Sequence, residues 1–276
     1  MAPQSVLIVG ASQGLGKALV HKYSTLLAPQ DIYATVRSPV EDGTFPKGVN
    51  IIEGVDASQE DVGDKIVQGL AGRAMEIVVV VAGILKPEAS DPATSIARST
   101  DGSCAISGAG KGELEGSGRH VHDLQYCSLE SLLMSSSLTP HAKVALLTSE
   151  GGSIGLRTES EGGGMFGHHG SKAAGNMVGH LLAYDLKKKD AMVVMIHPGF
   201  LKTGMTKGAG MEEYYEKMGA VTPEEAAVPF VEFVEDMTME MSGKFWAPMG
   251  GRGIGNAEEV LGKKAAEQTT PLELPW

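Results

Sequence analysis

The chain has few cysteines, no excess of basic residues and no long hydrophobic run. Two cysteines in 276 residues cannot form a disulfide framework or a multi-cysteine metal site. No apolar run approaches the roughly 18 residues that a bilayer span needs. Lys and Arg number 23 against 34 Asp and Glu, so the formal net charge of -11 leaves nothing to neutralise nucleic-acid phosphates. The N-terminus lacks a basic segment, so no signal peptide is predicted. These features favour a cytoplasmic protein that binds neither nucleic acid nor membrane.

Short aliphatic runs alternate with segments of helical periodicity along most of the chain. Each run has the length of a strand buried on both faces, which favours a parallel sheet. The runs are Val6 to Val9, Ile32 to Val36, Val49 to Ile52, Ile77 to Val81, Val144 to Leu147 and Val193 to Ile196. Helix starts are indicated by a capping-box pattern at Ser58 and Asp61 and by Thr222 followed by Pro223. The alternation predicts one α/β domain over residues 1–276, a doubly wound parallel sheet of the Rossmann type.

One stretch, from about residue 87 to residue 140, departs from this alternation. A long apolar helix is expected before the run at Val144, but residues 99–118 are rich in Ser and Gly. Such a composition is typical of a loop, yet so long a loop is uncommon inside a compact domain. A shifted reading frame in the gene would give the same composition. We therefore expect an anomalous segment of low periodicity here.

A glycine-rich turn follows the first predicted strand and opens the first predicted helix. Glycines allow a tight turn and a close approach of the backbone to a pyrophosphate, and the helix N-terminus offers free N–H donors and a favourable dipole. Strand, turn and helix occur in the order that a dinucleotide-binding turn requires. The residues expected to contact the dinucleotide here are Gly10, Ser12, Gln13, Gly14, Leu15 and Gly16.

The GxxxGxG spacing of this turn resembles that of the short-chain dehydrogenase/reductase family. Further matches follow in the family's order: Asp56 after the third strand, Ala82 and Gly83 after the fourth, Ser149 after the fifth, Lys172 early in the next helix, and Pro198 and Gly199 with Thr203 after the sixth. The resemblance covers roughly residues 5–86 and 143–250. It is nearest to the branch of sniffer-like and C-factor-like carbonyl reductases, through residues 152–154, 171–177 and 243–246. It implies that Asp56, Ala82, Gly83, Pro198, Gly199 and Thr203 contact the cofactor.

The end of the second strand indicates which dinucleotide is bound. An acid there would hydrogen-bond the ribose 2′-OH of NAD, but the strand is followed by Arg37. A guanidinium suits a 2′-phosphate. Asp31 precedes the strand and cannot take the role of the acid. We therefore expect NADP(H), unless Arg37 is only a solvated surface residue.

The catalytic residues that the resemblance implies are present except for one. In the family a serine orients the carbonyl, a tyrosine passes the proton, and a lysine holds the nicotinamide ribose and lowers the tyrosine pKa. Ser149 and Lys172 match the serine and the lysine, but the tyrosine position, four residues before the lysine, is His168. Lys172 is also a cofactor contact in this scheme.

Three interpretations of His168 remain open. It replaces tyrosine as the proton donor, since imidazole titrates near neutrality, although the Lys172 cation would lower its pKa. Alternatively, reduction is lost and the fold binds NADP(H) as a sensor, scaffold or non-redox catalyst. In the third, His168 and His169 are polar residues at a helix start. A metal site built from these and His197 is rejected, because adjacent helical histidines point apart and no carboxylate or cysteine completes the set.

The sequence therefore predicts an NADPH-dependent reductase acting on a ketone or aldehyde of a small organic molecule. Residues 200–219 match the family's mobile substrate lid, and the apolar side chains Met205, Met211, Tyr214, Tyr215 and Met218 suggest an uncharged substrate, unless they only cover the core. Residues 156–164 are expected to form a flexible insertion at the mouth of the site. Family members often pair through helices that flank the fifth strand, so a homo-oligomer is an expected partner state.

Overall fold

The structure is a computed structural model that describes residues 5–56, 59, 61–81, 96–98, 104–106 and 137–276. Its centre is an eight-stranded sheet in the order β10-β9-β8-β7-β4-β1-β2-β3, and only β10 is antiparallel to its neighbour. The strands are β1 Val6–Val9, β2 Ile32–Thr35, β3 Asn50–Ile52, β4 Met75–Val80, β7 Leu138–Leu147, β8 Met192–Ile196, β9 Phe245–Ala247 and β10 Leu272–Leu274. A separate antiparallel pair joins β5 Ile96–Arg98 to β6 Cys104–Ile106. The predicted doubly wound α/β fold is confirmed.

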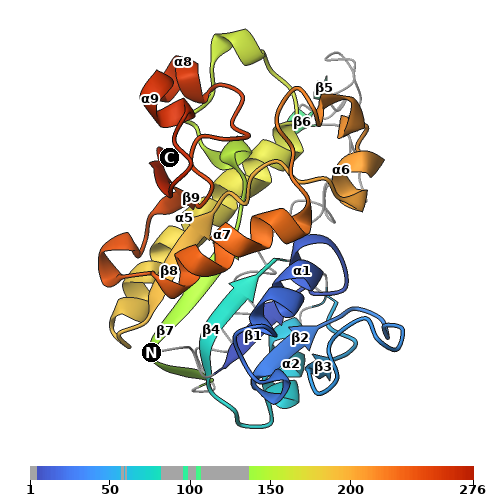
Figure 1. Cartoon of the computed structure of the whole chain (residues 1–276). Coiled ribbons are helices and arrows are strands. Elements are labelled where there is room, and N and C mark those ends of the chain that lie inside the picture. The colour runs from blue at the N-terminus through green and yellow to red at the C-terminus, as the bar shows by residue number, and fades with distance from the viewer. Residues whose placement is uncertain (1–4, 57–58, 60, 82–95, 99–103, 107–136) are drawn as a thin grey trace.

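Helices cover both faces of the sheet (Figure 1). One core cluster joins the sheet to α1 Gly14–Tyr23 and α7 Pro223–Glu235, and the other joins it to α2 Val62–Leu70 and α5 Phe166–Lys187. Shorter helices are α6 Gly204–Gly208, α8 Ala257–Leu261 and α9 Lys263–Ala266. The inner strands β1 and β8, and β4 from Ile77 to Val80, consist of apolar side chains that are almost fully buried, as their continuous apolar runs predict.

The structure confirms one of the two predicted helix caps. Thr222 caps α7 as expected, because its hydroxyl accepts the Glu225 N–H and the Glu225 carboxylate accepts the Thr222 N–H. Helix α2 begins after Asp61, whose side chain makes no capping hydrogen bond, and Ser58 lies outside the described residues. The pattern thus locates α2 without providing its cap.

The long strand β7 corrects one expectation. The sequence predicts a strand from Val144, whereas β7 begins at Leu138, inside the segment expected to have no regular element. Met75 pairs with Leu138, and the register between β4 and β7 then shifts before Ile77. Thr139, Pro140 and His141 have no apolar alternation, so hydrophobic patterning cannot reveal this extension. Most of residues 87–140 lies outside the described residues.

Strand order places the candidate site. Connections run outward in opposite directions from β1 and β4, which makes their carboxyl ends the switch point of the doubly wound sheet. In open α/β sheets, ligands bind in the crevice outside the strand ends at such a point. Gly10, Arg37, Val81, Ser149 and His197 follow the carboxyl ends of five different strands, so this edge of the sheet collects most of the predicted site residues.

Candidate active site

A cavity of about 690 Å³ opens at the carboxyl edge of the sheet. Its walls contain most of the residues that the sequence singled out: Gly10, Ser12, Gln13, Gly14, Leu15, Arg37, Asp56, Ser149, His168, Lys172, Pro198, Gly199 and Thr203. Gly16 is not among the lining residues, and Ala82 and Gly83 lie outside the described residues. Residues far apart in the sequence therefore share one cavity.

The glycine turn has the backbone geometry that its residues predict. Gly10 and Gly14 have φ angles of 90° and 54°, which favour glycine. The Gly10 N–H donates to Thr35 Oγ1 at 3.0 Å, which ties the turn to the end of β2. At Gly16 a Cβ atom would overlap the carbonyl oxygen of Gly10. The third glycine therefore lets α1 start close against the strand end.

Replacing Gly16 with alanine is expected to open this turn. The added Cβ meets backbone atoms of Gly10 and Ala11, which cannot rotate away as a side chain could. Overpacking of this kind costs about 1–3 kcal/mol, so we expect a lower melting temperature and a dinucleotide affinity at least tenfold weaker. Gly208→Ala is the control, because its Cβ would enter open space in α6. Equal melting temperatures and affinities for the two variants would contradict this account.

Arg37 and Asp56 line the cavity beside the glycine turn. Arg37 is exposed and forms no ion pair with any residue that the structure describes, so its guanidinium is available to a ligand. Asp31 instead pairs with Arg73 at 2.6 Å, before β2 begins. The charge at the end of β2 is therefore positive, in agreement with the sequence argument.

Ser149 lies two residues after the end of β7 and is the N-cap of a tight turn, the short helix η2 Glu150–Gly152. Its Oγ accepts the Gly151 N–H at 3.1 Å, which leaves the hydroxyl proton free to be donated elsewhere. Cβ atoms at Gly151 or Gly152 would collide with the His169 ring or with the Lys172 backbone. Two glycines therefore let the Ser149 turn lie directly on α5.

Helix α5 presents His168 and Lys172 to the cavity one turn apart. His168 Nδ1 is buried and has no hydrogen-bond partner within the described part of the chain. Burial lowers the pKa of His168 to about 4, with the charges of Lys172, His169 and Arg157 adding to the effect. Burial also lowers the pKa of Lys172 to about 8. At pH 7 the imidazole is neutral and most of the lysine carries its proton.

The segment after β8 closes the other side of the cavity. Gly199 has a φ of 89°, and Thr203 caps α6 by accepting the Thr206 N–H at 3.2 Å. The apolar side chains Phe200, Met205, Met211, Tyr214 and Met218 line the cavity from this segment. Tyr215, which the sequence grouped with them, turns its hydroxyl to Thr206 at 2.7 Å and does not line the cavity.

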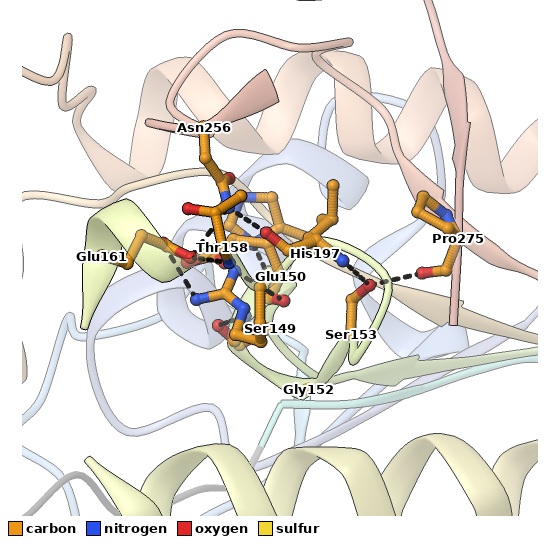
Figure 2. A network of polar contacts seen from close by, with 12 residues as sticks. Ser149, Glu150, Gly152, Ser153, Thr158, Glu161, His197, Asn256 and Pro275 are labelled. Carbon is orange, nitrogen blue, oxygen red and sulfur yellow. Dashed lines mark hydrogen bonds and ion pairs between the residues drawn. The ribbon is translucent and has the colours of Figure 1, made fainter. Parts of the chain in front are cut away.

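Residues 156–164 do not line the cavity, contrary to the expectation of an insertion at its mouth. Leu156 is fully buried, and Arg157 forms ion pairs with Glu150 and with Glu161, the latter at 3.1 Å. Asn256 donates to Glu161 at 2.9 Å (Figure 2). The segment therefore braces the Ser149 turn from outside.

Several cavity residues escaped the sequence argument, namely Thr148, Glu150, His169 and, as anything but a metal ligand, His197. The sequence could have indicated these cavity residues only because they are adjacent to Ser149, His168 and Pro198. The described residues contain no group of three or more side chains suited to a metal ion. Among the same residues, no helix combines the length and hydropathy of a membrane span.

Comparisons with known proteins find sequence similarity to dehydrogenases. No protein-family model matches the chain. A 108-residue stretch is 40% identical to the 1-hydroxy-2-glutathionyl-2-methyl-3-butene dehydrogenase of Rhodococcus sp., covering 39% of this chain and 44% of that protein. Over 265 residues, the chain is 28% identical to a short chain dehydrogenase of Penicillium aethiopicum, with 88% and 96% of the two chains covered. The sequence thus matches a dehydrogenase along most of its length.

Solved structures with the same fold include two carbonyl reductases. The carbonyl reductase Sniffer of D. melanogaster has a TM-score of 0.68 at 22% identity, covering 89% of this chain and 97% of that one. The NADPH-bound carbonyl reductase from chicken fatty liver has a TM-score of 0.71 at 18% identity, covering 90% and 93%. At these identities the likeness concerns the fold. Together with the dehydrogenase relatives, it makes the chain similar to short-chain dehydrogenases/reductases in sequence and in fold.

Proposed function

We propose that the protein is an NADPH-dependent oxidoreductase that reduces the carbonyl group of a small organic molecule. The observation that carries the proposal is the single cavity shared by the glycine turn, Arg37 and the group Ser149, His168 and Lys172. The dehydrogenase relatives and the NADPH bound by the chicken carbonyl reductase support it. The apolar side chains opposite β7 favour an uncharged substrate.

The residues present fit a dinucleotide with a 2′-phosphate. The glycine turn places α1's N-terminal N–H groups beside the cavity, where a pyrophosphate would be stabilised by the helix dipole. Arg37 would hold the 2′-phosphate, Asp56 the adenine side, and Lys172 the nicotinamide ribose. Pro198, Gly199 and Thr203 would contact the nicotinamide end, and all of these groups line the same cavity. The reduced nicotinamide would supply the hydride.

The chain's own residues then have to orient the carbonyl and provide one proton. The Ser149 hydroxyl, whose oxygen already accepts the Gly151 N–H, donates to the carbonyl oxygen. His168 Nε2 donates the proton as the oxygen becomes an alkoxide. A neutral imidazole that lost its only proton would become an anion, so a proton must reach Nδ1 in the same step. The ammonium of Lys172, one turn away, is the source, and solvent later restores it.

This relay balances without any additional reagent. The Nε2–H bond of His168 breaks as the O–H bond of the product forms, and a proton from Lys172 Nζ binds His168 Nδ1. His168 ends as its other neutral tautomer and Lys172 as a neutral amine. Both are reset when solvent protonates Nε2 and the Nδ1 proton returns to Lys172 Nζ. The lowered pKa of Lys172 suits a proton donor. His168 Nδ1 has no hydrogen-bond partner among the described residues, so the Lys172 side chain has to turn toward the ring for the transfer.

An NADP(H)-binding protein without redox turnover is the second candidate. The pKa of His168, lowered to about 4, favours it, because the imidazole alone is a poor acid at neutral pH. NADPH fluorescence titration measures binding, and NADPH consumption against a panel of aldehydes and ketones measures turnover. If the protein bound NADPH but consumed none, and His168→Ala bound NADPH equally well, the second function would replace the first.

Arg37→Ala is expected to weaken NADPH binding about 10- to 100-fold, because a hydrogen bond to a charged group contributes about 1.5–3 kcal/mol. NADH affinity should change little, since its ribose 2′-OH carries no charge. Fluorescence titration with both coenzymes measures the ratio, and Lys17→Ala, on α1 outside the cavity lining, is the charge-matched control. If Arg37→Ala weakened NADPH and NADH binding equally, Arg37 would not be the residue that binds the 2′-phosphate.

A further inference from the structure

His197 is a buried histidine at the cavity that the proposed reaction does not use. It follows β8 directly and is 5% exposed. Its backbone N–H donates to the Trp246 carbonyl at 2.9 Å, and the Thr148 N–H donates to the Ile196 carbonyl at 2.8 Å. The strands on both sides are therefore paired up to this position, and the His197 backbone is fixed by the sheet.

The ring of His197 reaches across to the turn that carries Ser149. The backbone N–H of Glu150 donates to His197 Nδ1 at 3.1 Å (Figure 2). An amide N–H can only donate, so Nδ1 must be the unprotonated nitrogen and the ring proton is on Nε2. Burial, together with the Arg157 charge, lowers the pKa of His197 to about 3. The ring is therefore a neutral, permanent acceptor.

The bond that His197 makes controls one peptide group. The Glu150 N–H belongs to the peptide that links Ser149 to Glu150, so holding it fixes the plane next to the Ser149 Cα. The rest of the turn is held elsewhere, by Arg157 on the Glu150 carboxylate and by Ser153 Oγ donating to the Pro275 carbonyl at 2.7 Å (Figure 2). His197 thus provides the contact between β8 and the residue directly after Ser149.

We propose that His197 is a positioning residue for Ser149, acting as a neutral acceptor that aims the serine hydroxyl into the cavity. The tautomer of His197 and its hydrogen bond to the Glu150 peptide do not depend on the proposed function. The effect of His197 on turnover rests on the proposed function. The role requires an acceptor at the Nδ1 position and neither charge nor a transferable proton. An asparagine carbonyl oxygen, also attached to the γ-carbon, can take that place, whereas leucine has a similar shape and no acceptor.

The kinetic test compares His197→Leu with His197→Asn. Because a misplacement of about 1 Å can cost 10²-fold in rate, we expect His197→Leu to lower kcat about 10- to 100-fold and His197→Asn to restore most of it. NADPH affinity should stay unchanged, because the phosphate-binding turn is not involved. In a Ser149→Ala background, His197→Leu should have almost no further effect. The proposal would be overturned if the losses of kcat from Ser149→Ala and His197→Leu multiplied in the double variant. It would also be overturned if His197→Leu and His197→Asn lowered kcat equally.

A second measurement does not depend on turnover, and its wild-type part needs no variant to fold. In ¹⁵N NMR of the wild-type chain, His197 should appear as the Nε2–H tautomer with no titration between pH 5 and 8, about the range where an ordinary histidine titrates. The Glu150 amide should exchange slowly with solvent, faster in His197→Leu and slowly again in His197→Asn. A proton on Nδ1, or a rapidly exchanging Glu150 amide in the wild type, would overturn the proposal. A wild type without NADPH consumption would defeat the reductase function and leave this result intact.

Discussion

Lys172→Met is expected to lower carbonyl reduction by about 10²- to 10⁴-fold, the usual contribution of a positioned proton donor. Methionine keeps an unbranched stem in α5 but has neither a charge nor a proton. In the relay, His168 could then give up its proton only by becoming an anion. NADPH consumption with an aldehyde that the wild type reduces measures the loss. A variant with more than half of the wild-type kcat would remove Lys172 from the proton route.

The pH dependence has a defined sign. The lysine can donate only while charged, and burial lowers its pKa to about 8, so turnover should fall as pH rises through about 8. For stability, the folded pKa lies below the value of about 10.4 in the unfolded chain. The unfolded state therefore binds more protons between about pH 8 and 10.4, and this group makes the fold more stable as pH rises across that window. At neutral pH the buried charge is a cost, so Lys172→Met should unfold no more easily than the wild type.

A control separates the charge from the fold. Lys172→Arg keeps a cation that does not titrate below about pH 12, so its alkaline loss near pH 8 should disappear even if its overall rate is low. Lys189→Met, in the exposed turn after α5, should change neither kcat nor the pH profile. An alkaline limb that stays near pH 8 in Lys172→Arg would assign that titration to another group.

Hydrophobic patterning located the interior of the sheet and failed at its margins. The strands at Val6, Ile32 and Val193 were predictable because buried parallel strands need continuous aliphatic runs. Strand β10 is three residues long and antiparallel at the edge. Strand β7 is an inner strand, but its start, which carries Pro140, resembles an edge because its pairing with β8 begins only at Lys143. Edge strands have weak hydrophobic patterns, since one side needs no burial and proline is tolerated there. These segments are strands because a neighbouring strand pairs with them, and their own composition does not predict it.

The candidate site was predictable where function depends on a local motif. The glycine turn and the spacing of His168 to Lys172 are visible within a few residues of sequence. His197 depends on a contact with Glu150, 47 positions away, that exists only because β7 and β8 are neighbours. The hydrogen bond from Asn256 to Glu161, 95 positions away, is equally non-local. Motif spacing cannot show which side chains hold the motif in place.

His168→Phe is expected to lower turnover about 10²- to 10⁴-fold, since phenylalanine keeps an aromatic ring in α5 and removes both nitrogens. His168→Tyr should recover much of that loss. Its phenol would lie one turn from the Lys172 cation, which lowers a tyrosine pKa. Because a phenol gives up its proton to form a stable anion, this variant needs no relay through the ring. NADPH consumption by the wild type and both variants, at equal cofactor occupancy, measures the three rates.

The order of the three rates decides between the two functions. A working imidazole relay requires a wild type well above His168→Phe, with Lys172→Met as inactive as His168→Phe. If the wild type equals His168→Phe while His168→Tyr alone consumes NADPH, the fold still holds the coenzyme and the carbonyl but histidine does not deliver the proton. The natural protein would then be a coenzyme-binding protein. A neutral ring with a pKa near 4 can catalyse only through its neighbour, so the dependence of His168 on Lys172 is the decisive property.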